Sequence, residues 1–440
     1  MTKMLNRIMV IMGIIGLFLI ISCRQSLEGY SEKTYSVEII EIDPAVTEAW
    51  ITIRVEGTEN SVAVELYQMD TLLFAGNLSK GDTIIYDNTL KPNTQYEYFL
   101  KYYKTPNLKL EGNQVAVNTY DTTNVPNYTW KEIFFPSPFG NGTFNDIHVI
   151  NENDYWLVGA VPNDTSEWQK PFNAVHYLNG EWHYYKVPYK SSNSDYMYVT
   201  ELSSLFYESP DKIWFGYGNL VFYNGESYRN VDLPNFVSRA LKIVESKNGL
   251  TYVLGVDGHI AYSSDRFNWT VKKFEDDKVF TAIFDYDNET YAALGNLGTT
   301  VFRHMDNEFI PIRLDSETPQ ALIRDAVNFK KNKFILAAAG IQYGCFNSKN
   351  HLIMNRINDA ITSSPISIKI EKKGINQIFV GGMDGDVYYF NGVKWQRIRD
   401  KNPVFFIYDM AVKDGIIYLV GEKPDIGIRW QPILIIGRPT

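Results

Sequence analysis

The sequence predicts an all-β protein, on three observations. Aromatic residues make up 15% of the 440 residues, with 30 tyrosines among them, whereas charged residues make up 21%. Aromatic and β-branched side chains favour the pleated surface of a sheet. Apolar runs of four or five residues recur along the chain, which indicates strands covered on both faces. Asn-Gly pairs, the strongest short hairpin signal, occur between several of these runs. A chain of this length is expected to form two or three domains.

The N-terminus is typical of an export signal. Lys3 and Arg7 precede an uncharged stretch of 14 residues, 8–21. A membrane-spanning helix needs about 20 apolar residues, so this stretch is short for a permanent anchor. It ends in Ile20-Ile21-Ser22-Cys23, which resembles the lipoprotein box of exported bacterial proteins.

That resemblance implies a signal peptide at residues 1–22, acylation of Cys23, including palmitate, and a polar tether over 23–32. Each buried CH₂ contributes about 0.8 kcal/mol, so several acyl chains together hold a protein firmly to a membrane. An uncleaved N-terminal anchor, with an incidental Cys23, is the alternative. By the sorting rule of enteric bacteria, aspartate directly after the lipidated cysteine keeps a lipoprotein from the outer membrane, and this chain has Arg24 there. The rule implies a cell-envelope protein at the outer membrane, facing either periplasm or medium.

Charge, cysteine and histidine content exclude several classes of protein. The net charge of −9 becomes −11 once Lys3 and Arg7 leave with the signal, so nucleic acid is not an expected partner. Cys23 and Cys345 are the two cysteines, and Cys345 is predicted to be a lone buried thiol. The six histidines show no metal-ligand spacing, and the sequence has no phosphate loop or Gly-x-Ser-x-Gly elbow. No metal, cofactor or catalytic residue is predicted.

Residues 33–120 are predicted to form a β-sandwich, because short alternating strands follow one another without a helical pattern. The predicted strands are 35–42, 49–55, 62–69, 82–88, 96–103 and 114–119. Leu90-Lys91-Pro92-Asn93-Thr94-Gln95-Tyr96 resembles the tyrosine-corner motif of fibronectin type III domains, and Trp50 falls where that family has its core tryptophan. The resemblance implies a spacer or interaction module without chemistry of its own. Another immunoglobulin-like sandwich is the alternative.

From residue 127 onward, one strand pattern recurs seven times: a large apolar residue begins a short run that ends at a small residue. The copies lie at 155–159, 213–216, 252–255, 291–295, 334–338, 378–381 and 418–421. Gly216, Gly255 and Gly295 are successively 39 and 40 residues apart. We expect the small residues to let neighbouring sheets approach closely.

A second pattern, a large residue at the head of an alternating outer strand, also recurs. Its copies begin at Trp130, Trp182, Tyr228, Trp269, Phe309, Leu352 and Trp395. Repeats of about 40–45 residues with four strands each are typical of β-propeller blades. Residues 127–440 are therefore predicted to form a seven-bladed β-propeller, with six or eight blades as alternatives. Residues 130–135 precede the first inner strand, so they are predicted to close the ring as a Velcro strand beside the last strand, at 426–436.

Two long loops of the first blade, 160–173 and 188–201, are predicted to lie on one face of the ring. The loop between the second and third strands of a blade is on the same side as the crossover to the next blade. Loops on a rigid scaffold often carry binding surfaces, and exposed aromatic side chains anchor partners well. The predicted binding face therefore contains Trp168, Tyr196 and Tyr198. Disordered insertions, or loops packed on the sandwich, are the alternatives.

The segment Ser263-Ser264-Asp265-Arg266-Phe267-Asn268-Trp269 resembles a degenerate Asp-box of sialidase-type propellers, in which the motif folds a turn. Arg239, Arg324 and Arg399 are predicted to be surface residues, because no motif marks them; positions that face the axis are the alternative. Asp384-Gly385-Asp386 is expected to be a hairpin turn. The predicted function is that of a monomeric, membrane-tethered, non-catalytic binding or assembly protein with a protein or carbohydrate partner. A sialidase-like glycoside hydrolase or polysaccharide lyase is the alternative.

Overall fold

The computed structural model of the chain divides into two compact units. It describes residues 36–57, 61–105, 108–123, 125–137, 140–162, 170–190, 196–234, 236, 239–296, 298–316, 322–330, 333–338, 340–347, 349–356, 365–370, 377–424 and 429–440. The predicted signal, tether and lipidated Cys23 lie outside these ranges. Within them, no helical segment has the length and apolar character to span a bilayer.

The described residues of the first unit form seven strands in two antiparallel sheets, with the orders β1-β2-β5 and β4-β3-β6-β7. The strands are β1 (Ser36–Pro44), β2 (Ala49–Glu56), β3 (Val62–Gln68), β4 (Thr71–Leu78), β5 (Gly81–Asp87), β6 (Gln95–Thr105) and β7 (Leu108–Asn118). Strand β4 was not predicted. It is an edge strand whose side chains are mostly exposed or half-buried, so its sequence lacks the alternation that reveals a half-buried strand.

A buried tyrosine links the two sheets of this unit. The hydroxyl of Tyr98, on β6, donates a hydrogen bond of 2.8 Å to Oδ2 of Asp87 at the end of β5. Both residues are completely buried. Burial, reinforced by the neighbouring carboxylate, raises the pKa of Tyr98, so its hydroxyl remains a donor. Tyr96, the residue of the predicted corner, is half-buried two positions earlier.

The described residues of the second unit form seven sheets of four or five strands and one two-stranded hairpin. The first three sheets are β9 (Thr143–Asn151), β10 (Asp154–Val161), β11 (Phe172–Leu178), β12 (Glu181–Tyr185); β15 (Ser204–Ser209), β16 (Lys212–Gly216), β17 (Leu220–Tyr223), β18 (Tyr228–Val231); and β19 (Ala240–Glu245), β20 (Thr251–Gly255), β21 (His259–Ser263), β22 (Thr270–Lys273). The fourth and fifth sheets are β23 (Val279–Tyr286), β24 (Glu289–Gly295), β25 (Thr299–Met305), β26 (Glu308–Ile312); and β28 (Asp325–Lys330), β29 (Lys333–Ala338), β30 (Gly340–Phe346), β31 (Leu352–Arg356), with β27 (Leu314–Ser316) parallel to β31. The sixth and seventh sheets are β32 (Pro365–Ile370), β33 (Ile378–Gly382), β34 (Val387–Phe390), β35 (Trp395–Arg399); and β36 (Phe406–Lys413), β37 (Ile416–Pro424), β38 (Trp430–Pro439), β8 (Tyr128–Phe134).

These seven sheets pack against one another in chain order, and the last packs against the first. Tyr155 and Leu157 of β10 share a buried cluster with Tyr418 and Leu434 of the seventh sheet. A buried cluster of the same kind joins each of the remaining pairs of neighbouring sheets. The second strands are buried along their apolar runs, as their composition predicts. A closed ring of stacked antiparallel sheets is a β-propeller.

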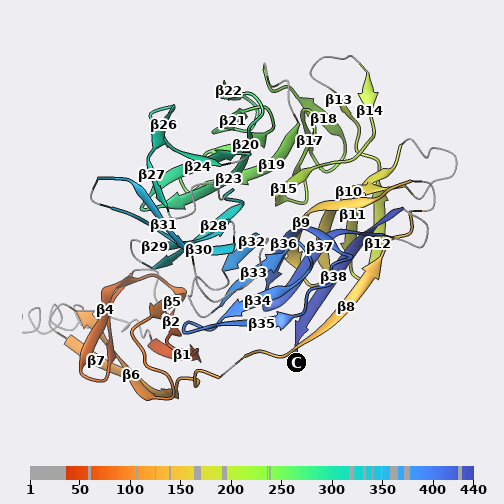
Figure 1. Cartoon of the computed structure of the whole chain (residues 1–440). Coiled ribbons are helices and arrows are strands. Elements are labelled where there is room, and N and C mark those ends of the chain that lie inside the picture. Colours follow the sequence, from red (N-terminus) through yellow and green to blue (C-terminus); the bar gives the residue numbers. More distant parts are fainter. Residues whose placement is uncertain are drawn as a thin grey trace, which may run out of the picture. The chain divides into compact units, whose positions relative to one another are not determined.

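The ring closes through the strand that precedes the first blade. Strand β8 pairs antiparallel with β38, from Phe134 opposite Ile433 to Tyr128 opposite Pro439 (Figure 1). The predicted closure is therefore present, although β38 begins only at Trp430. Because β8 completes the seventh sheet, that sheet has four strands like its neighbours.

Candidate binding site

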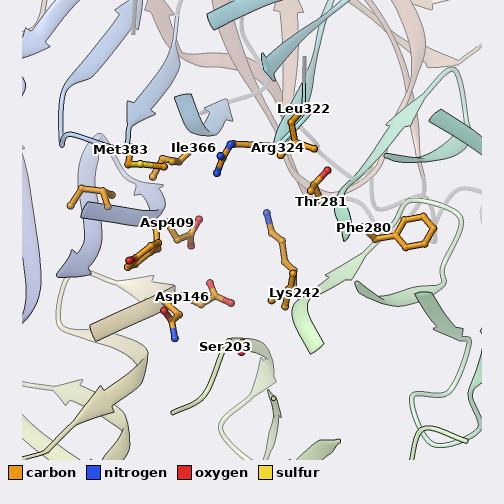
Figure 2. A pocket seen from close by; sticks show the side chains of 14 residues that line it. Asp146, Ser203, Lys242, Phe280, Thr281, Leu322, Arg324, Ile366, Met383 and Asp409 are labelled. Atoms are coloured by element: carbon orange, nitrogen blue, oxygen red, sulfur yellow. The ribbon is translucent and has the colours of Figure 1, made fainter. Parts of the chain in front are cut away.

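All seven sheets, through their first strands or the residues beside these strands, contribute to one cavity of about 360 Å³. One lining residue from each sheet, in chain order, is Asp146, Ser203, Lys242, Thr281, Arg324, Ile366 and Asp409. Because every sheet contributes, this axial cavity lies on the axis of the ring. Figure 2 shows Asp146, Lys242, Arg324 and Asp409 pointing into the space and Phe280 turned away from it.

A β-bulge near the start of the first strand recurs in five sheets. The residues left without a partner on the second strand are Asn145, Leu241, Thr281, Ile366 and Tyr408. All five line the axial cavity. A bulge interrupts the regular alternation of side chains and re-aims the extra residue. The repeated bulge therefore directs side chains of these strands to the axis.

Gly159 and Gly421 make room for two of these bulges. A Cβ atom on Gly159 would lie 2.0 Å from the carbonyl oxygen of Thr143, and one on Gly421 would lie 2.0 Å from that of Phe406. In both cases the crowded backbone belongs to the first strand of the same sheet. The expectation that small residues serve the approach of neighbouring sheets is thus wrong at these two positions.

Asp146 and Asp409 form a carboxyl pair in the axial cavity. Asp146 accepts a hydrogen bond of 2.9 Å from the backbone N–H of Leu205. Burial raises the pKa of Asp146, and the charge of Asp409 together with a hydrogen bond between the two carboxyls raises it further. We expect the pair to share one proton, so it carries one negative charge.

The raised pKa of Asp146 predicts a pH dependence of stability. Above the ordinary value of 3.8, the unfolded chain releases this proton while the folded chain keeps it. The free energy of unfolding therefore falls as the pH rises, until the raised pKa is passed, by at most about 1.4 kcal/mol per pH unit. The Asp146→Asn variant lacks this titration and should show a flatter profile than the natural protein between about pH 4 and pH 8.

Urea unfolding of both proteins across this pH range measures the difference. The titrations of groups outside this pair are expected to be similar in both. Asp400→Asn is the control, because the side chain of Asp400 is 83% exposed. If Asp146→Asn kept the slope of the natural protein, the carboxyl pair would not hold a proton in the way described.

A second cavity of about 430 Å³ shares Asp146, Lys242 and Asp409 with the axial cavity. His148 also lines this second cavity. Burial, followed by the charge of Lys413, lowers the pKa of His148, so its imidazole is held neutral over a wider pH range. The charged residues that the two cavities share thus lie where two spaces meet.

Of the three arginines considered from the sequence, Arg324 lines the axial cavity. Arg239 forms an ion pair of 2.8 Å with Glu201. The side chain of Arg399 is only 8% exposed and forms an ion pair of 2.9 Å with Glu132, so it occupies neither the axis nor the surface.

The predicted loop 188–201 contains a short hairpin, which the sequence did not reveal. Its strands are β13 (Tyr189–Lys190) and β14 (Met197–Tyr198). Tyr196 is 77% exposed, Met197 52% and Tyr198 39%. Trp168, the third residue of the predicted binding face, lies outside the described residues.

Hydrogen bonds fix this hairpin to the first two blades. Asn230 of β18 accepts a hydrogen bond of 2.6 Å from the backbone N–H of Lys190. The hydroxyl of Tyr189 lies 2.7 Å from Oγ1 of Thr200. Asn173, at the end of the other predicted loop, donates to the carbonyl oxygen of Thr200 at 2.8 Å. The described ends of the two predicted loops are therefore joined by a hydrogen bond.

The degenerate Asp-box forms the turn between β21 and β22. The carboxylate of Asp265 accepts the backbone N–H groups of Asn268 at 2.7 Å and Phe267 at 2.8 Å. These hydrogen bonds, that of Asn268 first, lower the pKa of Asp265. Trp269 lies within the turn, because β22 begins at Thr270. The motif has a structural role, at the end of the blade opposite the hairpin β13–β14.

Among the residues that the structure describes, no group of three or more His, Cys, Asp or Glu side chains could hold a metal ion. Asp384-Gly385-Asp386 forms the turn between β33 and β34, with Gly385 at a φ of 75°. Cys345 is half-buried, which corrects the expectation of a buried thiol.

No family model matches the chain, and no curated protein matches it. Solved structures are similar to part of it, among them two of YCF48. A structure of YCF48 bound to a D1 peptide is 15% identical, with a TM-score of 0.49 over 71% of this chain and 97% of that chain. A structure of YCF48 from Cyanidioschyzon merolae is 12% identical, with a TM-score of 0.45 over 70% of this chain and 98% of that chain.

Proposed function

We propose that the chain is a membrane-tethered, non-catalytic binding protein that presents a seven-bladed β-propeller to a protein partner. Lipid on Cys23 supplies the tether, and the first unit is a fibronectin type III-like spacer. The partner binds on the face that carries the hairpin β13–β14. The observation behind this proposal is the exposure of Tyr196, Met197 and Tyr198 on a hairpin fixed by hydrogen bonds.

The chemistry of the hairpin suits a protein partner. Tyrosine offers a large, rigid contact surface with a polar end and loses little conformational entropy on binding. The flexible thioether of Met197 adapts to irregular surfaces. Arg239 stacks 5.0 Å from the ring centre of Tyr217, whose own ring packs 5.1 Å from that of Tyr189. A charged residue thus borders the aromatic cluster, as in the polar rim of many interfaces.

Sequence and topology support the tether and the spacer. Cys23 ends a short apolar stretch after two basic residues, which is the pattern of a lipoprotein signal. The first unit has a three-stranded and a four-stranded sheet, the strand numbers of an immunoglobulin-like sandwich, and its Trp50 is 5% exposed.

A glycan-active enzyme is the second candidate, and the carboxyl pair Asp146–Asp409 on the axis is the observation that favours it. Retaining glycosidases separate their two carboxyls by about 5 Å, and inverting enzymes by about 6.5–9.5 Å. Asp146 and Asp409 are in direct hydrogen-bond contact, which is closer than either arrangement. The geometry therefore favours binding over hydrolysis.

The test is recovery of a partner with the double variant Tyr196→Ala/Tyr198→Ala. The tagged full-length chain is purified from its own cell envelope, and co-purifying proteins are quantified by mass spectrometry. We expect a specific partner to be recovered at least about tenfold less with the double variant, because aromatic anchors dominate interface energies.

Phe267→Ala is the matched control, because Phe267 is 40% exposed on the opposite face. It should retain the partner. Unchanged recovery with the double variant would refute the binding face. Release of sugar from a polysaccharide by the natural protein, lost in Asp409→Asn, would instead establish the enzyme.

A further inference from the structure

We infer that the axial cavity binds a small carboxylate, held by Lys242 and Arg324 and enclosed by the apolar side chains beside them. This site is distinct from the hairpin β13–β14, so the inference stands or falls independently of the proposed function.

Within the described part of the chain, Lys242 and Arg324 lack the ion-pair partner that a buried arginine of the propeller has. That arginine, Arg399, is paired with Glu132 at 2.9 Å. Among the described residues, no carboxylate oxygen lies within 4.0 Å of the side-chain nitrogens of Lys242 or Arg324. Arg324 is exposed as a residue, and the partial burial of its guanidinium beside the cavity lowers its pKa. An unpaired charge in such surroundings is stabilised by an anion.

Asp146 and Asp409 do not neutralise both cations. The contact with Asp409 and burial raise the pKa of Asp146, so we expect Asp146 to hold its proton and the pair to contribute one negative charge. Lys242 and Arg324 contribute two positive charges to the lining of the axial cavity. The remaining single positive charge matches a monoanion such as a carboxylate.

Both cations come from fixed backbone positions. The N–H of Arg324 donates to the carbonyl oxygen of Ala337 at 2.7 Å. Thr281, itself part of the lining, donates from Oγ1 to the carbonyl oxygen of Ile323 at 2.5 Å. Lys242 belongs to β19, in the third blade, whereas Arg324 directly precedes β28 in the fifth. Figure 2 shows the two side chains extending into the space from these separate positions. The backbone thus fixes where the two cationic side chains enter the cavity, which lowers part of the ordering cost of binding an anion.

The size and walls of the cavity define the rest of the ligand. Its volume of about 360 Å³ is that of a small ligand site. Leu322, Ile366 and Met383 supply apolar surface. The ligand chemistry is therefore a carboxylate attached to a short apolar chain, which either a free organic acid or the C-terminus of a peptide provides.

Isothermal titration calorimetry on the full-length chain tests the inference with sodium hexanoate and the uncharged analogue hexanamide. We expect hexanoate to bind at least about tenfold more tightly than hexanamide, because charge-assisted hydrogen bonds to both cations need the carboxylate. Arg324→Gln and Lys242→Gln should each weaken hexanoate binding at least about tenfold. Arg397→Gln is the control, since the side chain of Arg397 is 49% exposed and is not part of the lining.

A second arm distinguishes the sources of the carboxylate. The tripeptide Ala-Ala-Leu is titrated with a free and with an amidated C-terminus. Preference for the free peptide over hexanoate supports a peptide ligand, and the reverse supports a free acid. The inference is overturned if neither carboxylate binds, if hexanamide binds as tightly as hexanoate, or if both cation variants retain full affinity. The comparison of hexanoate with hexanamide needs no variant, so it decides the matter even if a substitution unfolds the chain.

Discussion

Leu434→Ala is expected to lower the free energy of unfolding of the propeller by about 2–5 kcal/mol. Leu434 is completely buried on β38, in the cluster that joins the seventh sheet to the first. Truncation removes apolar contacts and leaves a cavity beside Tyr155 and Tyr418, which belong to second strands on either side of this junction. Strands held in the middle of their sheets cannot move far to fill it, so the cost should lie in the upper part of the range.

Chemical denaturation of the full-length chain, followed by tryptophan fluorescence, measures this effect. Ile310→Ala serves as the control, because Ile310 is 37% exposed on the outer strand β26. Its loss should change the unfolding free energy by less than about 1 kcal/mol. Equal effects of the two substitutions would mean that the junction between the last and first blades contributes no more than a surface contact.

Gly421→Ala is expected to destabilise the propeller by at least about 1–3 kcal/mol, although it adds a single methyl group. The added Cβ would lie 2.0 Å from the carbonyl oxygen of Phe406, so the backbone of the bulge at Tyr408 would have to shift. Because Asp409 directly follows the bulge, the substitution should also disturb the carboxyl pair on the axis.

Gly381→Ala is the matched control, since Gly381 ends the same apolar run one blade earlier. There the nearest atom to the new Cβ is Sδ of Met410, at 3.1 Å, at the flexible end of a side chain that can move aside. Denaturation curves of the two variants give the comparison. If Gly381→Ala lowered the free energy of unfolding as much as Gly421→Ala, backbone crowding at the bulge would not explain why position 421 is a glycine.

The blades could be predicted from sequence because their second strands are buried on both faces. Residues 252–254, for instance, are completely buried, and burial on both sides requires the continuous apolar run that is visible in the sequence. The turn between β11 and β12 could also be predicted. Asn179 and Gly180 adopt φ values of 50° and 95°, which few other residue pairs tolerate.

The axial cavity could not be predicted in the same way. Asp146, Lys242 and Asp409 follow bulges, and a bulge depends on the register between two strands, which a single strand's sequence does not encode. In the sequence these charges look like the solvent-facing positions of alternating strands. The hairpin β13–β14 could not be predicted for another reason. Each of its strands has two residues, which is too short to show the alternation of apolar and polar residues. Lipidation of Cys23 and the role of Trp168 stay predictions.

The pairing of β8 with β38 has a consequence for biosynthesis. Strand β8 leaves the ribosome before the strands of the first six sheets, whereas its partner β38 is made after all of them. Joining segments so far apart along the chain is entropically costly and slow. Until β38 is made, we therefore expect the N–H and C=O groups of β8 to stay unpaired, so that β8 can pair with the wrong strands or with other chains. A stop codon directly before β38 would thus leave β8, at the beginning of the ring, without its pairing strand.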